Sequence, residues 1–150
     1  PMELTFLGLK MTVYKRNRQE TSTQYIVTAR ELQVAVIRYV MNEKRVPKHW
    51  RYILVKDVVH CVSELVNNVI AACKIFPNTS EKLAERRHYL DSARVCCYQL
   101  QNYFQLMISL KIGETSADSL RNISGLLLSE IELLVKTAKN SKIIGIQQEV

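Results

Sequence analysis

Residues 46–59 read VPKHWRYILVKDVV, and this stretch marks the start of a long helix. Pro47 suits a first helical turn, because the N–H that proline lacks would have no partner there. After this start the apolar residues recur every three or four positions, as they do along the buried face of a helix. The stretch is also basic, with Lys48, His49 and Arg51 close together. It therefore poses the question of whether this helix start holds something acidic.

The rest of the chain is also predicted to be helical. Its 150 residues include only 4 glycines and 3 prolines, a scarcity that favours long helices with few turns. Short connections force neighbouring helices to run antiparallel, which predicts an all-α, up-down-up-down four-helix bundle. Apolar stripes of helical spacing cover about residues 21–44, 47–75, 80–111 and 116–142.

The bundle is predicted to occupy residues 21–145. Residues 1–20 are expected to form an N-terminal arm and residues 146–150 a C-terminal tail. A stripe as wide as that of the second helix, which includes Ile53, indicates burial on more than one side. The residues predicted to line the core are Ile26, Ala29, Leu32, Val36, Val40, Trp50, Ile53, Leu54, Val58, Cys61, Val62, Leu65, Val66, Val69, Ala72, Phe76, Leu83, Leu90, Ala93, Cys97, Leu100, Phe104, Met107, Leu120, Ile123, Leu127, Ile131, Leu134 and Ala138.

Local signals predict how the helices begin and end. Asn78 with Glu81 three residues later matches a capping box for the third helix. Gly113 is expected to be the residue that ends this helix in a left-handed conformation. Thr115 with Asp118 is expected to cap the fourth helix.

No set of residues predicts catalysis or a bound cofactor. There is no glycine-rich phosphate loop and no HExxH motif. Residues 85–88 read E-R-R-H, the spacing of a diiron ligand pair, but a second copy is absent, so we expect no metal. The cysteines, among them Cys61 and Cys73, are expected to be reduced thiols lining the core of a cytoplasmic protein. No apolar run is long enough to predict a membrane span.

The charge balance points to a polyanionic partner. Lys and Arg number 21 against 14 Asp and Glu, which gives a net charge of +7. Such an excess favours nucleic acid, an anionic membrane surface or an acidic protein. Few aromatic residues accompany the basic clusters, so phosphate contacts are expected rather than base stacking. The candidate nucleic-acid-binding residues are Arg38, Lys44, Arg45, Lys48, His49, Arg51, Lys56, Arg86, Arg87 and Arg94.

Several sequence features together resemble a known family. Residues 46–54 read V-P-K-H-W-R-Y-I-L, residues 67–72 read N-N-V-I-A-A, and residues 76–77 are F-P. Residues 87–93 follow with R-x-x-L-x-x-A before a long apolar stripe. Over about residues 24–140 the chain resembles the four-helix-bundle family of 23S rRNA intervening-sequence proteins and the accessory variability determinant of diversity-generating retroelements.

The resemblance implies a small, basic, non-enzymatic protein that assembles into a homopentameric barrel. The retroelement members bind the element's reverse transcriptase and its template RNA, and they support mutagenic copying into complementary DNA. The intervening-sequence branch usually has a glycine after the N-x-A segment, where this chain has Ala72, Cys73 and Lys74. This difference favours the retroelement branch. The alternatives are an intervening-sequence-type protein and a scaffold that contacts an acidic protein.

Overall fold

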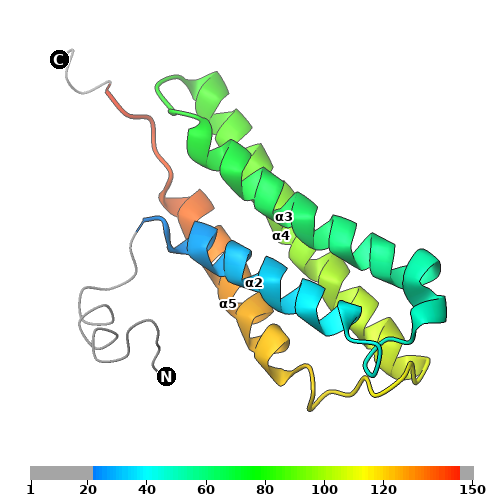
Figure 1. Cartoon of the computed structure of the whole chain (residues 1–150). Coiled ribbons are helices and arrows are strands. Elements are labelled where there is room, and N and C mark those ends of the chain that lie inside the picture. The colour runs from blue at the N-terminus through cyan, green and yellow to red at the C-terminus, as the bar shows by residue number, and fades with distance from the viewer. Residues whose placement is uncertain (1–21, 146–150) are drawn as a thin grey trace.

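Four α-helices form a bundle in the computed structural model, which describes residues 22–145 (Figure 1). Each helix packs against two neighbours, in the order α2, α3, α4, α5 and back to α2. Figure 1 shows successive helices running in opposite directions. No strand occurs within the described residues, so the predicted four-helix, all-α fold is confirmed. The helices are α2 (Gln24–Met41), α3 (Lys56–Lys74), α4 (Ser80–Ser109) and α5 (Arg121–Asn140).

The core is a continuous apolar cluster to which all four helices contribute. Leu32, Leu65, Leu100 and Leu134 are almost fully buried and come from α2, α3, α4 and α5 in turn. These positions belong to the predicted stripes, so the helical spacing of the apolar residues identified most of the core correctly.

Two core predictions are wrong, and one buried residue was not predicted. Ile53 and Phe76 are exposed, at 66% and 59% of their surface, because each lies where the chain departs from a regular α-helix. In α5 the fully buried position is Glu130, whereas Ile131 is only half-buried. The spacing from Leu127 to Leu134 allows either position to face the core, and Ile131 packs against its edge.

The second helix does not start as a regular α-helix. Pro47 precedes η1 (Lys48–Trp50), a single 3₁₀ turn, and η2 (Arg51–Val55), a π-helical turn, leads into α3. Trp50 is half-buried and packs against the edge of the core. Turns of both kinds are short departures from α-helical geometry, and π turns are frequent at functional sites.

The helix ends also differ from the predicted caps. The cap of α4 is Thr79, whose Oγ1 accepts a hydrogen bond from the Lys82 N–H at 3.1 Å, so the Asn78 capping box is wrong. The first helix was predicted to reach residue 44 and ends at Met41. The fourth was predicted to start near residue 116 and begins at Arg121, without a side-chain cap.

A left-handed residue ends α4, but it is Lys111 (φ 56°) rather than Gly113. The Ile112 N–H bonds to the Met107 carbonyl at 3.1 Å, and the Lys111 N–H bonds to the Ile108 carbonyl at 3.0 Å. This pair of bonds is a Schellman motif, and the burial of Ile112 completes it.

Gly113 has a different role, in the contact between two loops. A Cβ atom built on it would lie 2.4 Å from the Arg45 carbonyl oxygen and 2.8 Å from that of Lys44. The same loops are joined by bonds from the Glu114 N–H to the Lys44 carbonyl (2.9 Å) and from Thr115 Oγ1 to the Arg45 carbonyl (3.0 Å). We call this contact the loop clasp. It occupies the Thr115 hydroxyl that was expected to cap α5.

The predicted arm (residues 1–20) and tail (146–150) lie outside the described residues. The first described residues and the last lie at the same end of the bundle as the α3–α4 loop (Figure 1). We call this the terminal end (residues 22–25, 72–87 and 136–145). The opposite end, with residues 42–56 and 110–121, is the loop end.

Candidate nucleic-acid interface

The predicted interface residues divide between the two ends of the bundle. Residues 44–56 gather at the loop end, and Arg38 lies in the last turn of α2 beside them. Arg86 and Arg87 lie near the start of α4 at the terminal end, and Arg94 lies between the ends. The structure therefore brings one group of these residues together and places the other away from it.

Two arginines of the loop end already have partners within the fold. Arg45 donates from Nη1 to the Glu114 carbonyl at 3.1 Å, and its guanidinium lies 5.6 Å from the centre of the Tyr39 ring. Arg51 pairs with Glu43 at 3.4 Å between Nη2 and Oε2. The second pair is exposed, so it contributes little to stability and a stronger anion can replace Glu43.

The remaining candidate cations at or near the loop end project into solvent. Arg38, Lys44, Lys48 and Lys56 are exposed, and their side chains make no hydrogen bond or ion pair with another of residues 22–145. His49 is exposed too and stacks at a tilt beside Trp50, with 5.6 Å between ring centres. These side chains are available to neutralise phosphates.

The π-helical turn presents an aromatic side chain that was missed in the sequence. Tyr52 is 87% exposed, and it lies four residues from both Lys48 and Lys56. The sequence predicts few free aromatic residues beside the basic clusters, and Tyr52 is one of these few. Free aromatic rings beside cations are typical of surfaces on which single-stranded bases stack.

Arg86 and Arg87 hold the terminal end of the bundle together. Arg86 donates from Nη1 to the Ala72 carbonyl at 3.0 Å and from Nε to Ser141 Oγ at 3.3 Å. Arg87 donates to the carbonyls of Ala138 and Ser141, at 3.2 and 2.7 Å. Both therefore donate to carbonyls at the ends of α3 and α5, where the Ala72 and Ala138 carbonyls also accept the N–H groups of Ile75 and Ser141 at 3.3 Å.

These bonds change what the two arginines can do. Charge reversal at Arg86 would remove the side-chain donor to the Ala72 carbonyl, and charge reversal at Arg87 would leave the Ser141 carbonyl without a donor among residues 22–145, so both changes would also weaken the fold. Arg87 does not pair with Asp91, four residues later, because Asp91 pairs with Arg94 at 3.3 Å. The three candidate arginines on α4, Arg86, Arg87 and Arg94, therefore all have partners within the fold, whereas the exposed lysines of the loop end have none among residues 22–145.

The cysteines do not form a metal site. Among residues 22–145 no group of three or more His, Cys, Asp or Glu side chains is placed to hold a metal ion. Cys61, Cys96 and Cys97 are buried, as expected of core thiols, but Cys73 is exposed. Hydrogen bonding with Cys96, together with burial, raises the pKa of Cys61, and burial raises that of Cys97, so both remain thiols.

Glu130 is the most perturbed acid of the described chain. It is fully buried, and neither carboxyl oxygen has a hydrogen-bond partner among residues 22–145. Burial raises its pKa to about 9, so the side chain is neutral at physiological pH. It faces the apolar core rather than either end of the bundle, which makes it a determinant of stability rather than of binding.

Comparison of the chain with protein-family models, with curated proteins and with solved structures found no match. In the described residues no helix combines the length and the apolar character that a membrane span requires.

Proposed function

We propose that the protein is a non-enzymatic accessory subunit of a diversity-generating retroelement that binds nucleic acid through its loop end. The observation that carries this proposal is the set of exposed lysines at the loop end, Lys44, Lys48 and Lys56, whose side chains make no hydrogen bond or ion pair within residues 22–145, together with exposed His49 and Tyr52 in the same segment. Lysines neutralise phosphates irrespective of sequence, while an exposed tyrosine adds stacking to unpaired bases. Single-stranded template RNA or its complementary DNA suits both kinds of contact.

The resemblance to the retroelement accessory proteins supports two further parts of the proposal. The first is a reverse transcriptase partner, which would be brought to the template by the bound RNA. The second is assembly into a homopentamer in the cytoplasm. Val27, Val34 and Met41 lie seven residues apart along α2 and are each about half exposed, as expected of a helix face that another subunit covers.

The decisive experiment compares two double variants with the same change in charge. Lys48→Glu with Lys56→Glu alters the loop end, and Lys82→Glu with Lys139→Glu alters exposed lysines at the other end. Binding of single-stranded RNA is measured over a range of salt concentrations. We expect the loop-end variant to bind RNA at least about tenfold more weakly. The slope of log affinity against log salt concentration should also become smaller by about 2, because two phosphate contacts are removed.

A loss of the same size in both variants, or binding that does not respond to salt, would contradict the proposal. Tyr52→Ala is expected to weaken binding to single-stranded RNA more than to duplex RNA, since only unpaired bases can stack on the ring. Capture of a protein partner that persists after nuclease treatment, with no RNA binding, would instead favour the scaffold alternative.

A further inference from the structure

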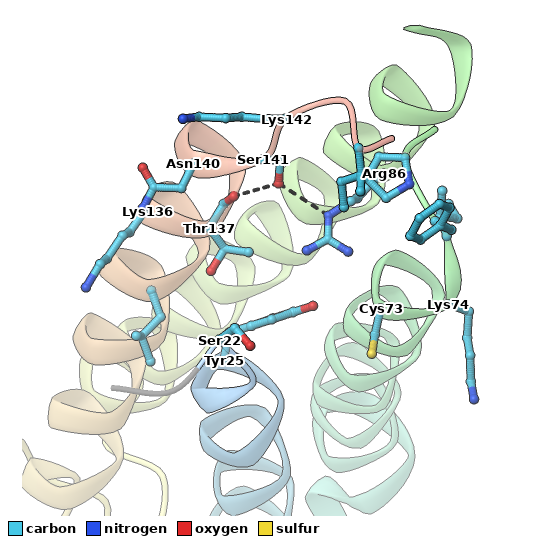
Figure 2. A pocket seen from close by; sticks show the side chains of 15 residues that line it. Ser22, Tyr25, Cys73, Lys74, Arg86, Lys136, Thr137, Asn140, Ser141 and Lys142 are labelled. Carbon is cyan, nitrogen blue, oxygen red and sulfur yellow. Dashed lines mark hydrogen bonds between the residues drawn. The ribbon is translucent and has the colours of Figure 1, made fainter. Parts of the chain in front are cut away.

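A pocket at the terminal end has no role in the proposed function. It has a volume of about 670 Å³ and lies where the start of α2, the ends of α3 and α5, and Arg86 of α4 come together (Figure 2). Its size falls in the range of small-molecule sites, which are concave and combine apolar walls with a few fixed polar groups. Apolar residues and polar residues both line this pocket.

The charged side chains that line the pocket are all cationic. They are Lys74, Arg86, Lys136 and Lys142, and no carboxylate from the described residues accompanies them. Figure 2 shows the Arg86 guanidinium directed into the space above Tyr25, between the ends of α3 and α5. A pocket with this lining favours an anion over a neutral or cationic molecule.

Arg86 is held in place before any ligand arrives. Its bonds to the Ala72 carbonyl and to Ser141 Oγ fix the plane of the guanidinium, and Tyr25 lies beside it. A guanidinium has more N–H donors than these contacts use, so donors remain for a phosphate or carboxylate. A fixed cation binds an anion at a lower cost in conformational entropy than a flexible lysine does.

Part of the lining is apolar and includes an exposed ring. Phe76 is 59% exposed although it lines the pocket, and Ile75 and Ile144 line the pocket as well. Packing within residues 22–145 leaves most of this ring in contact with solvent. A flat, partly apolar group stacked on the ring would remove that surface from water.

We propose that this pocket binds a nucleoside phosphate, with the phosphate on Arg86 and the base against Phe76. The phosphate would belong either to a free nucleotide or to the phosphorylated end of a strand, because the pocket would meet the same chemistry in both. The proposal stands independently of RNA binding at the loop end, since the two regions share no residue.

The test is calorimetric titration of the full chain with adenosine monophosphate, adenosine and inorganic phosphate. We expect the nucleotide to bind at least about tenfold more tightly than adenosine, because only the nucleotide carries the charge that Arg86 recognises. Phosphate alone should bind more weakly than the nucleotide, because it leaves the ring of Phe76 uncovered.

Arg86→Ala and Arg87→Ala form a matched pair of variants. Both remove bonds to carbonyls at the terminal end, but only Arg86 lines the pocket. We expect Arg86→Ala to lose about tenfold in affinity for the nucleotide and Arg87→Ala to stay within about twofold. Phe76→Ala should lose several-fold affinity and remain folded, because the ring is mostly exposed.

Equal affinity for nucleotide and adenosine, equal losses in the two arginine variants, or no binding of the nucleotide would overturn the proposal. Oligonucleotides of one sequence with a 5′-phosphate or a 5′-hydroxyl then separate the two sources. A preference for the phosphorylated strand identifies a strand end, and binding of the nucleotide without that preference identifies a free nucleotide. The loop-end variant Lys48→Glu with Lys56→Glu should bind the nucleotide normally, so failure of one proposal is distinguishable from failure of the other.

Discussion

The two ends of the bundle are both basic, but their cations do different things. At the terminal end, Arg86 and Arg87 donate to backbone carbonyls and tie α4 to the ends of α3 and α5. At the loop end, the Glu114 N–H and the side chains of Thr115 and Arg45 join the two loops, and Lys48 and Lys56 extend into solvent. A basic cluster therefore indicates an interface only where its donors are not already used by the fold.

The last carbonyls of the helices are satisfied in different ways. α3 and α5 are each followed by a residue in an extended conformation, Ile75 and Ser141, whose N–H groups bond to the carbonyls of Ala72 and Ala138, and Arg86 and Arg87 donate to the same two carbonyls. α4 ends in a Schellman motif, which satisfies its carbonyls with backbone N–H groups. Arginines therefore donate to carbonyls at helix ends in the terminal end, whereas at the loop end Arg45 donates to the Glu114 carbonyl within a loop.

The largest expected effect lies between the two ends, in the shared core. The Glu130 carboxyl has a pKa of about 9 in the fold, against 4.5 in the unfolded chain. The folded state thus holds a proton that the unfolded state releases as pH rises above 4.5. We expect this one group to lower the free energy of unfolding by about 3 kcal/mol between pH 4.5 and pH 7, and the loss to continue until about pH 9.

Urea unfolding of the wild type and of Glu130→Gln over this pH range measures the effect, since glutamine does not titrate. Hydrogen exchange at the two ends should increase together as pH rises, after correction for intrinsic exchange rates, because both ends rest on the same core. Parallel pH profiles for the two proteins would show that Glu130 is not the group responsible.

The next largest loss of stability is expected from a substitution at the loop end alone. Gly113→Ala is expected to lower the free energy of unfolding by roughly 3 kcal/mol, because the new Cβ would collide with the Arg45 carbonyl and the backbone is left-handed there. Gly125→Ala is the matched control in α5, where a Cβ meets nothing within 4 Å. The free energy of unfolding of this control should rise by up to about 1 kcal/mol, because alanine has the higher helix propensity. Chemical denaturation of both variants is sufficient, and a stable Gly113→Ala protein would argue against a close loop clasp.

A smaller effect is expected at the terminal end. Arg87→Ala removes two bonds to the carbonyls of Ala138 and Ser141, and should cost about 1–2 kcal/mol because the side chain is partly screened by water. Arg94→Ala loses only its exposed pair with Asp91 and should change stability by less than about 1 kcal/mol. Equal effects in thermal unfolding would mean that Arg87 does not cap α5.

The smallest expected change in stability comes from Lys111, at the loop end. Lys111 occupies a left-handed position that glycine adopts without strain, so Lys111→Gly should raise the free energy of unfolding by about 1 kcal/mol. Lys111→Ala removes the same charge but keeps a Cβ, and we expect no comparable gain. A gain in both variants would attribute the effect to charge rather than to backbone conformation.

The four helices were predictable because their apolar residues repeat with helical spacing, and α4 was located to within two residues at its C-terminal end. Their ends were less predictable, since Thr79, Asn78 and Thr115 are all competent caps and tertiary contacts select among them. Glu130 was missed because an isolated carboxylate is seldom fully buried.

The candidate interface was predictable as a set of residues but not as a set of free donors. Nothing in the local sequence distinguishes Arg87, which bonds to carbonyls of α5 about fifty positions away, from an arginine in solvent. Tyr52 was missed because the sequence predicted a regular α-helix over residues 51–55, where the structure has a π turn. Both errors arise where the conformation depends on contacts remote in sequence.

The loop clasp also bears on how fast the chain folds and unfolds. Its bonds join Arg45 to Glu114 and Thr115, about seventy residues along the chain, whereas α3 and α4 meet across a short turn. Bringing distant segments together costs more entropy than closing a short loop, so the α3–α4 hairpin should form early and the clasp late. Contacts absent from the transition state govern unfolding. Gly113→Ala should therefore accelerate unfolding and leave the rate of folding nearly unchanged, which makes the clasp a determinant of the protein's kinetic lifetime.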